Sequence, residues 1–111
     1  MREIVLALTT VPADFDVSTL ARELVEAGVA ACVTVLPGVR SVYKWQGVIN
    51  EDVEQQLLIK TTRDRVQDAW AALQARHPYD VPEFAVLPVI DGNPNYLQWI
   101  ADAVGSGERG S

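Results

Sequence analysis

The stretch from Ala31 to Thr61 limits most what this chain can fold into. Two extended runs rich in apolar and β-branched residues follow each other there without a helical segment between them. The first run is interrupted at Pro37-Gly38, and the second covers Val53 to Thr61. Asn50 to Asp52 are turn formers, so we expect the chain to reverse there and form a long β-hairpin. Gly47 is the expected position of a β-bulge.

The segments on either side of this hairpin alternate between strand and helix patterns. Apolar residues at helical spacing mark the helices, and Asp16 and Asn93 are suitable N-caps. In chain order we expect a strand over Glu3 to Thr10, a helix over Asp16 to Ala27, a helix over Arg63 to Arg76, a strand over Phe84 to Ile90 and a helix that begins at Pro94.

The resulting order, β-α-β-β-α-β with an extra C-terminal helix, predicts an α+β fold. Right-handed crossovers place both main helices on one face of an antiparallel sheet, which gives the ferredoxin-like sandwich. A chain of 111 residues forms one domain of ordinary size, to which we assign residues 1–104. Residues 105–111 are polar and glycine-rich, and we expect them to form a flexible tail.

Composition argues against several classes of partner. The net charge of −6 repels phosphate groups, and the nine basic residues form no stripe with aromatic residues, so we expect no nucleic-acid partner. The apolar run Val29 to Val33 is far shorter than the ~20 residues of a membrane span. The apolar stretch near the N-terminus is too short for a signal peptide. We therefore expect a cytoplasmic protein with no membrane partner.

The expected sheet has more apolar surface than two helices can cover. Leu57, Leu58 and Ile59 are consecutive, as are Val89 and Ile90, so both faces of these strands carry apolar side chains. A large exposed apolar patch usually marks a partner surface. We therefore expect self-association through the sheet.

His77 is the only histidine, and three roles are open to it. It could bind a metal ion together with Asp80 and Glu83, or act as a base for the single thiol, Cys32. The apolar neighbours of Cys32 instead predict a buried, inert thiol. Pro78 disfavours helical geometry at the residue before it, so we favour the third role, in which His77 ends the second helix.

Other polar and aromatic residues suggest a cleft only weakly. Glu51, Asp52 and Glu54 are expected at the hairpin tip, where a solvated turn is the simpler interpretation. Tyr43 and Trp45 share one strand face and could wall a cleft with Lys60, whose ammonium group would bind an anion. The remaining candidates, Tyr79, Tyr96 and Trp99, are aromatic residues of the kind found in packing or at interfaces.

Several longer strings resemble those of the CutA family, the divalent-cation tolerance proteins. The similarity runs from about Leu8 to Ile100 and includes ACV before a PGV turn, Y-x-W-x-G, ED-x-E, IKT, HPY-x-x-PE and G-x-x-x-YL-x-W. The resemblance implies a ferredoxin-like subunit in a tight homotrimer, like the nitrogen-regulatory PII proteins. It also implies a role in tolerance of divalent cations, copper above all, with no required cofactor.

The resemblance also implies site residues. In copper-binding members the proposed ligands are a cysteine and a pair of histidines; here Thr9 stands at the cysteine position and Arg76 at the first histidine, so only His77 remains as a candidate ligand for Cu²⁺ or another divalent cation. The residues around the cleft between subunits match the family strings fully: Tyr43, Trp45, Lys60, Tyr79, Glu83, Tyr96 and Trp99.

From these observations we expect a non-catalytic homotrimer that binds or responds to a metal ion, copper in particular, or a small ligand at clefts between subunits. One alternative is a small enzyme in which His77 and Glu83 perform acid/base chemistry and Lys60 holds an anion. The other alternative is a structural trimer that anchors partner proteins.

Overall fold

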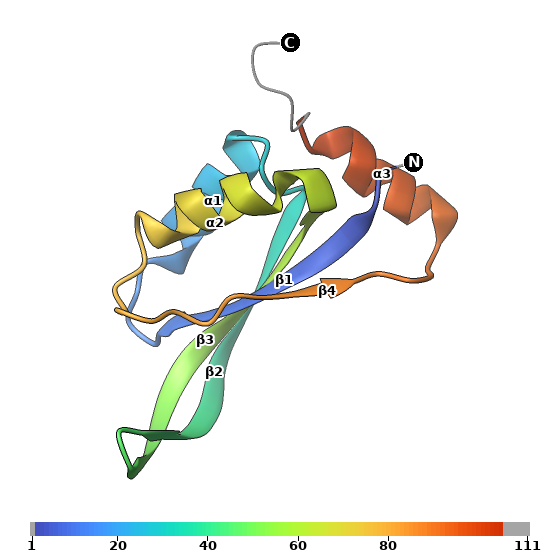
Figure 1. The fold of residues 1–111 in the computed structure, drawn as a ribbon. Helices are drawn as coiled ribbons and strands as arrows, with labels where there is room; N and C mark the ends of the chain where they lie inside the picture. Colours follow the sequence, from blue (N-terminus) through green and yellow to red (C-terminus); the bar gives the residue numbers. More distant parts are fainter. Residues whose placement is uncertain (1, 106–111) are drawn as a thin grey trace.

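The computed structural model describes residues 2–105 and has the predicted order of elements (Figure 1). The elements are β1 (Ile4–Pro12), α1 (Val17–Glu26), β2 (Cys32–Trp45), β3 (Val48–Thr62), the 3₁₀ turn η1 (Arg63–Arg65), α2 (Val66–Gln74), β4 (Ala85–Pro88) and α3 (Pro94–Ala103). The predicted tail, apart from residue 105, lies outside the described residues.

The four strands form one antiparallel sheet in the order β2-β3-β1-β4, which confirms the ferredoxin-like fold. Helices α1 and α2 lie together over one face of this sheet (Figure 1). Alternate side chains of the central strands, including Ala7 and Ile59, point at them and are fully buried. Leu24 and Leu73 complete this core from the two helices. Burial of each large side chain stabilises the fold by about 1.5–3 kcal/mol.

Helix α3 packs on a second, smaller core at one end of the sheet. Ile100, Ala101 and Val104 of this segment lie against Ile4 and Ala31. By strand alternation, Ile4 points away from the face that α1 and α2 cover. Helix α3 therefore covers only one end of the second face of the sheet.

Sequence signals set the helix starts correctly. The Asp16 side chain accepts a hydrogen bond from the backbone N–H of Thr19, and Asn93 caps α3 in the same way, with Pro94 at the first helical position. The second helix is shorter than predicted because it begins as the η1 turn and ends at Gln74. The last strand is also shorter, and Pro88 lies at its end on an edge of the sheet, where no ladder donor is needed.

The hairpin reverses at Gln46-Gly47, so the predicted turn at Asn50 to Asp52 is wrong. Both central residues have positive φ, +50° and +81°, which is the signature of a two-residue type I′ turn. The irregularity in the ladder falls between Leu36 and Val39, at Pro37-Gly38, and not at Gly47. Polar residues such as Asn50 lie within β3 itself. This part of the hairpin extends beyond the body of the protein, so its side chains can reach water from within a strand.

Two surfaces of the chain lack cover. The first is the open face, which we define as the face of the sheet opposite α1 and α2, where Leu6, Leu8 and Leu58 are partly exposed and Leu87 is exposed. The second is the arm, the part of the hairpin between residues 42 and 53, which pairs with no other strand and projects from the body (Figure 1). The arm exposes six large apolar side chains: Val42, Tyr43, Trp45, Val48, Ile49 and Val53.

Arg2 fastens the end of α3 to the sheet, and its replacement tests this attachment. The guanidinium donates to the carbonyls of Ala101 (2.9 Å) and Val104 (3.0 Å) and pairs with Asp64 (3.1 Å). We expect Arg2→Met to lower the free energy of unfolding by about 1–3 kcal/mol, because several charge-assisted hydrogen bonds are lost. Denaturant titration at fixed protein concentration measures the change.

The matched control is Arg63→Met. The Arg63 side chain is mostly exposed and lies 3.9 Å from Glu3, so its removal should change stability by less than about 0.5 kcal/mol. Equal effects of the two substitutions would contradict the role assigned to Arg2.

Candidate functional site

The predicted cleft residues fall into two groups within one chain. Tyr43, Tyr79 and Glu83 contact residues of the central and outer parts of β3, and Trp45 lies beside the turn of the arm. Lys60 lies at the opposite end of β3, and Tyr96 and Trp99 lie on α3. Tyr43 pairs with Asn50, which is ten residues from Lys60 along β3, or roughly 33 Å. One chain therefore does not form the predicted cleft of Tyr43, Trp45 and Lys60.

His77 follows α2 and uses both ring nitrogens within the chain. Its Nδ1 accepts a hydrogen bond from the backbone N–H of Tyr79 (3.1 Å), so Nε2 carries the ring proton and donates it to the carbonyl of Thr10 (2.7 Å). The backbone N–H of His77 also bonds to the Leu73 carbonyl (3.0 Å). These contacts support the predicted role of His77 at the end of the helix.

Tyr79 and Glu54 form a partly buried pair on the open face. The Tyr79 hydroxyl donates to Glu54 Oε2 at 2.6 Å, and Glu54 is only 7% exposed. Burial, this hydrogen bond and the negative charge of Glu54 together raise the pKa of Tyr79 above its usual value. Glu54 is thus a buried residue of β3, and its predicted place at the hairpin tip is wrong.

Two further polar contacts extend this cluster. The Tyr43 hydroxyl donates to Asp52, which raises the pKa of Tyr43, and both side chains are exposed. The Gln56 amide donates to the Thr9 carbonyl (2.8 Å) and lies 3.4 Å from Glu83 Oε2. The cluster places the phenol groups and carboxylates of three chain segments, β2, β3 and the connection from α2 to β4, on one side of the sheet.

The alternation of side chains along β3 is the sequence signal that could have placed Glu54 and Gln56 in this cluster. Glu54 and Gln56 share the parity of Lys60 along β3, so they lie on the open face. Treating Asn50 to Asp52 as a turn hid this, because it separated the acidic residues from the strand that carries them.

The three positions implied as copper ligands do not converge. Thr9 is fully buried beneath the helices, and its hydroxyl has no hydrogen-bond partner in the described chain. Arg76 pairs with Glu23 of α1, and His77 is bonded as described above. Among residues 2–105, no three His, Cys, Asp or Glu side chains are placed to hold a metal ion. The donor side chains of this part of the chain therefore do not fit a transition-metal centre within one subunit.

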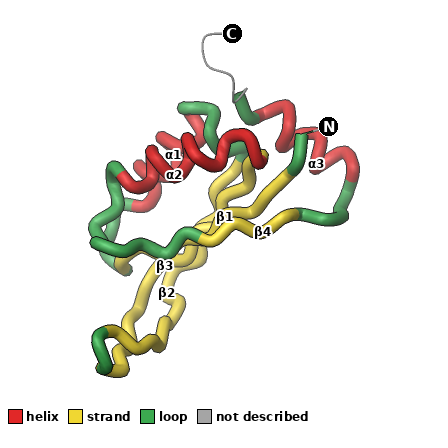
Figure 2. The backbone as a smooth tube through the Cα atoms, in the orientation of Figure 1, coloured by secondary structure: helices red, strands yellow, loops and turns green. Residues whose placement is uncertain are grey.

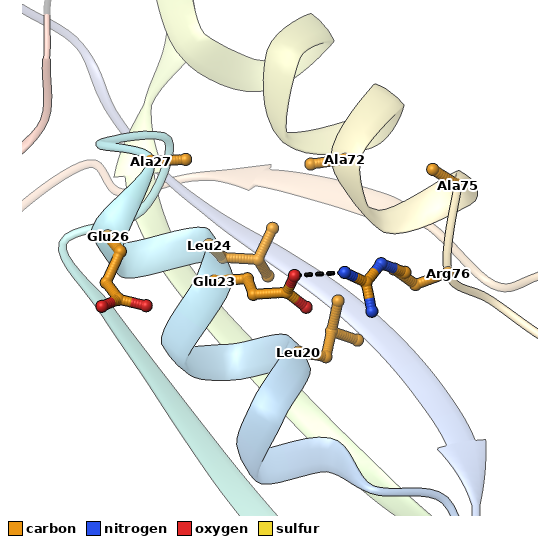
Figure 3. A pocket seen from close by; sticks show the side chains of 8 residues that line it. All are labelled: Leu20, Glu23, Leu24, Glu26, Ala27, Ala72, Ala75 and Arg76. Carbon is orange, nitrogen blue, oxygen red and sulfur yellow. Dashed lines mark hydrogen bonds and ion pairs between the residues drawn. The ribbon is translucent and has the colours of Figure 1, made fainter.

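The Arg76–Glu23 pair closes one side of a groove between α1 and α2 (Figure 3). The groove has a volume of about 520 Å³ and a floor of small and branched apolar side chains: Leu20, Leu24, Ala27, Ala72 and Ala75. Its walls come from the helices, so it lies on the side of the sheet opposite the open face. None of the predicted cleft residues lines it.

At the other end of β3, Lys60 is engaged with its neighbours on β2. Its ammonium group donates to the Thr34 hydroxyl and lies 3.6 Å from Cys32 Sγ. Cys32 is partly exposed, whereas the sequence predicted a buried thiol, and its pairing with Lys60 places it on the open face.

Tyr96 and Trp99 stack on the outer side of α3. Their ring centroids are 5.9 Å apart with an interplanar angle of 20°, and the residues are 43% and 49% exposed. An exposed aromatic pair of this kind is typical of an interface.

Comparisons with known proteins agree with the fold. The family model described as CutA1 divalent ion tolerance protein matches residues 5–103. The divalent-cation tolerance protein CutA of Thermus thermophilus is 44% identical over 105 residues, which is 95% of this chain and 100% of that protein, and its solved structure has a TM-score of 0.85.

Two other solved structures extend the likeness. CutA1 from Oryza sativa has a TM-score of 0.89 at 35% identity and covers 94% of this chain and 95% of its own. The protein from Nostoc sp. that is described as a PII-like CutA has a TM-score of 0.83 at 29% identity and covers 92% and 98%.

The raised pKa of Tyr79 predicts a stability change at alkaline pH. The folded protein keeps the phenol proton that the unfolded chain loses near its ordinary pKa of about 10. Stability from this pair is therefore present below about pH 10 and is lost as the pH rises above it. Denaturant midpoints between pH 8 and 11 should fall more steeply in the wild type than in Tyr79→Phe.

Tyr43→Phe provides the comparison. Tyr43 and Asp52 are exposed, so water stabilises the Tyr43 phenolate. Tyr43→Phe should therefore flatten the dependence of the denaturant midpoint on pH less than Tyr79→Phe does. An equal or larger effect of Tyr43→Phe would contradict the assignment to Tyr79.

Proposed function

Because the chain belongs to the CutA1 divalent ion tolerance protein family, we propose that it is a non-catalytic homotrimer that acts in divalent-cation tolerance. In this proposal the trimer binds a metal ion, such as copper, or a small ligand at clefts between its subunits. The residues of these clefts are those that the sequence singled out: Tyr43, Trp45, Lys60, Tyr79, Glu83, Tyr96 and Trp99.

The observation that carries the proposal is the pair of uncovered apolar surfaces, the open face and the arm. A two-stranded hairpin is at best marginally stable in water by itself. Here the arm exposes Val42 and Ile49 at 63% and 64%. Contact with other copies of the chain would cover both the arm and the leucines of the open face, as exposed apolar patches of this kind require.

Assembly also accounts for the division of the cleft residues. Tyr43 and Trp45 lie on the arm, whereas Lys60, Tyr96 and Trp99 lie at the far end of the same chain. A trimer in which the arm of one subunit reaches the α3 end of another would bring the two groups together. The exposed Tyr96–Trp99 stack offers a flat apolar surface for such a contact.

The geometry supports a non-catalytic role more than acid/base chemistry. Both nitrogens of His77 are bonded within the chain, and Glu83 is 3.4 Å from the Gln56 amide, with no contact to His77. A general base needs a free nitrogen within reach of the substrate proton. The alternative enzyme would therefore have to release His77 from the carbonyl of Thr10 or the amide of Tyr79.

We place the protein in the cytoplasm, in line with the sequence. The sequence basis of this proposal is that Cys32 is the only cysteine, so the fold does not depend on an intrachain disulfide. Separately from the question of compartment, none of the helices in residues 2–105 combines the length and the hydropathy of a membrane span.

Light scattering of the purified protein tests the assembly. The expected mass is that of three 12.2 kDa chains. Val48 is 60% exposed on the arm, and we expect Val48→Asp to shift the protein toward monomers, because a charge would be desolvated at the contact. Val25→Asp, on the exposed side of α1, should leave the mass unchanged. A monomeric wild type would refute the proposal.

Calorimetric titration with Cu²⁺ tests the metal role of His77. Because its two nitrogens serve the chain, we expect His77→Ala to lower stability and to leave the Cu²⁺ isotherm of the folded protein unchanged. Saturable binding that disappears in the variant would instead make His77 a ligand. A wild type with no saturable binding would favour a small organic ligand or the anchor role.

A further inference from the structure

The arm carries large apolar side chains on both of its faces. Figure 2 shows its two strands projecting beyond the helices and beyond the rest of the sheet. Residues that pair directly across a hairpin lie on the same face of it. The register therefore divides the exposed apolar side chains of the arm into an aromatic face, with Tyr43, Trp45 and Val48, and an aliphatic face, with Val42, Ile49 and Val53.

Two side-chain contacts agree with this division. The Tyr43 hydroxyl bonds to Asp52 on the aromatic face, and Arg40 pairs with Glu51 at 3.2 Å on the aliphatic face. Each pair lies diagonally across the ladder, so its two side chains point to the same side. The aromatic face continues into the open face, because the even-numbered residues of β3 point to that side. The aliphatic face lies on the opposite side of the arm.

The proposed assembly leaves this aliphatic face without an occupant. In that proposal Tyr43 and Trp45 meet the α3 end of a neighbouring copy, which lies on the other side of the arm. The arm is a single layer of two strands, so a surface that packs on one side does not cover the other. Val42, Ile49 and Val53 are nevertheless 63%, 64% and 52% exposed. An apolar row of this kind needs a cover of its own.

The two faces also differ in charge. The aromatic face carries the carboxylate of Asp52, whereas the aliphatic face carries the ammonium group of Lys44 beside the Arg40–Glu51 pair. Among residues 2–105, no carboxylate forms an ion pair with Lys44. A chain with a net charge of −6 attracts such a face. Another copy also offers the leucines of its open face, which lack cover as well, so it suits the aliphatic face in charge and in apolar character.

We propose that the arm is held between two other copies of the chain, one on its aromatic face and a different one on its aliphatic face. This inference rests on the proposed function, because it gives the arm a position within the proposed trimer. It also gives a physical reason for three subunits. In a closed dimer each arm has one neighbour, whereas a ring of three is the smallest closed assembly in which each arm has two.

A charge on the aliphatic face tests the second contact. We expect Ile49→Asp to raise the protein concentration at which trimers dissociate by about 100-fold or more, because an unpaired charge would be buried. Light scattering over a dilution series measures this concentration. Ile49 is mostly exposed in the single chain, so the subunit should fold as before, which circular dichroism checks. The matched change Val25→Asp, on α1, should leave the dilution curve unchanged.

The outcomes separate this inference from the proposed function. A wild type that is monomeric would refute the proposed trimer and the inference together. A trimeric wild type that dissociates with Val48→Asp but stays intact with Ile49→Asp would overturn only the inference, because the aliphatic face would then be free.

Photo-crosslinking tests whether the two faces meet different copies. The photoreactive residue p-benzoylphenylalanine replaces Val42, Val48 or both in a chain that is co-expressed with an excess of unmodified chain, so that a trimer rarely holds two modified chains. Each single replacement should give crosslinked pairs, and the double replacement should give products of three chains on a denaturing gel. The same residue in place of Val25 should give no crosslink to another copy.

Two results of the crosslinking would contradict the proposal. The first is the absence of crosslinked pairs from the replacement of Val42, which would leave the aliphatic face without a neighbour. The second is a double replacement that gives products of no more than two chains, because one copy would then cover both faces of the arm. Crosslinking does not depend on a change of charge, so it decides the matter even if Ile49→Asp prevents folding.

Discussion

The two helices α1 and α2 cover only one face of the four-stranded sheet. Most other features of this protein follow from the incomplete cover of the second face. The helices α1 and α2 bury Ala7, Leu57 and Ile59, and α3 covers only the end of the second face around Ile4. The remaining leucines of the open face, and the arm beyond it, are left partly exposed in the single chain. These exposed apolar side chains are the reason why we propose that the chain assembles with other copies.

The incomplete cover of the second face also determines which polar side chains are accessible to a ligand. On the helix-covered side, the charged groups of Arg76 and Glu23 pair with each other. On the open face, by contrast, Glu54, Gln56 and Tyr79 form a connected cluster beside the arm. The aromatic residues of α3 lie at the other end. Because the two groups lie at opposite ends of β3, the proposed clefts are placed between subunits.

His77 shows how a lone reactive residue can serve structure. Its position before a proline predicted that it would end a helix, and the structure adds bonds to Thr10 and Tyr79 that occupy both ring nitrogens. The sequence could not predict the bond to Thr10, because Thr10 is 67 residues away from His77 in the chain. The two residues meet only because α2 packs on the sheet. The resemblance made His77 a candidate metal ligand, whereas in this structure both of its ring nitrogens are bonded within the chain.

The sequence by itself determined the order of elements, the N-caps Asp16 and Asn93, the ferredoxin-like fold and the family, because these depend on local propensity and on short patterns of residues. Tertiary structure decided the rest. Gln46 adopts positive φ at the hairpin turn because strand pairing sets the register, and Glu54 is buried because Tyr79 reaches it from a distant segment. Such contacts depend on the packed arrangement of the whole sheet, which no local stretch of sequence contains.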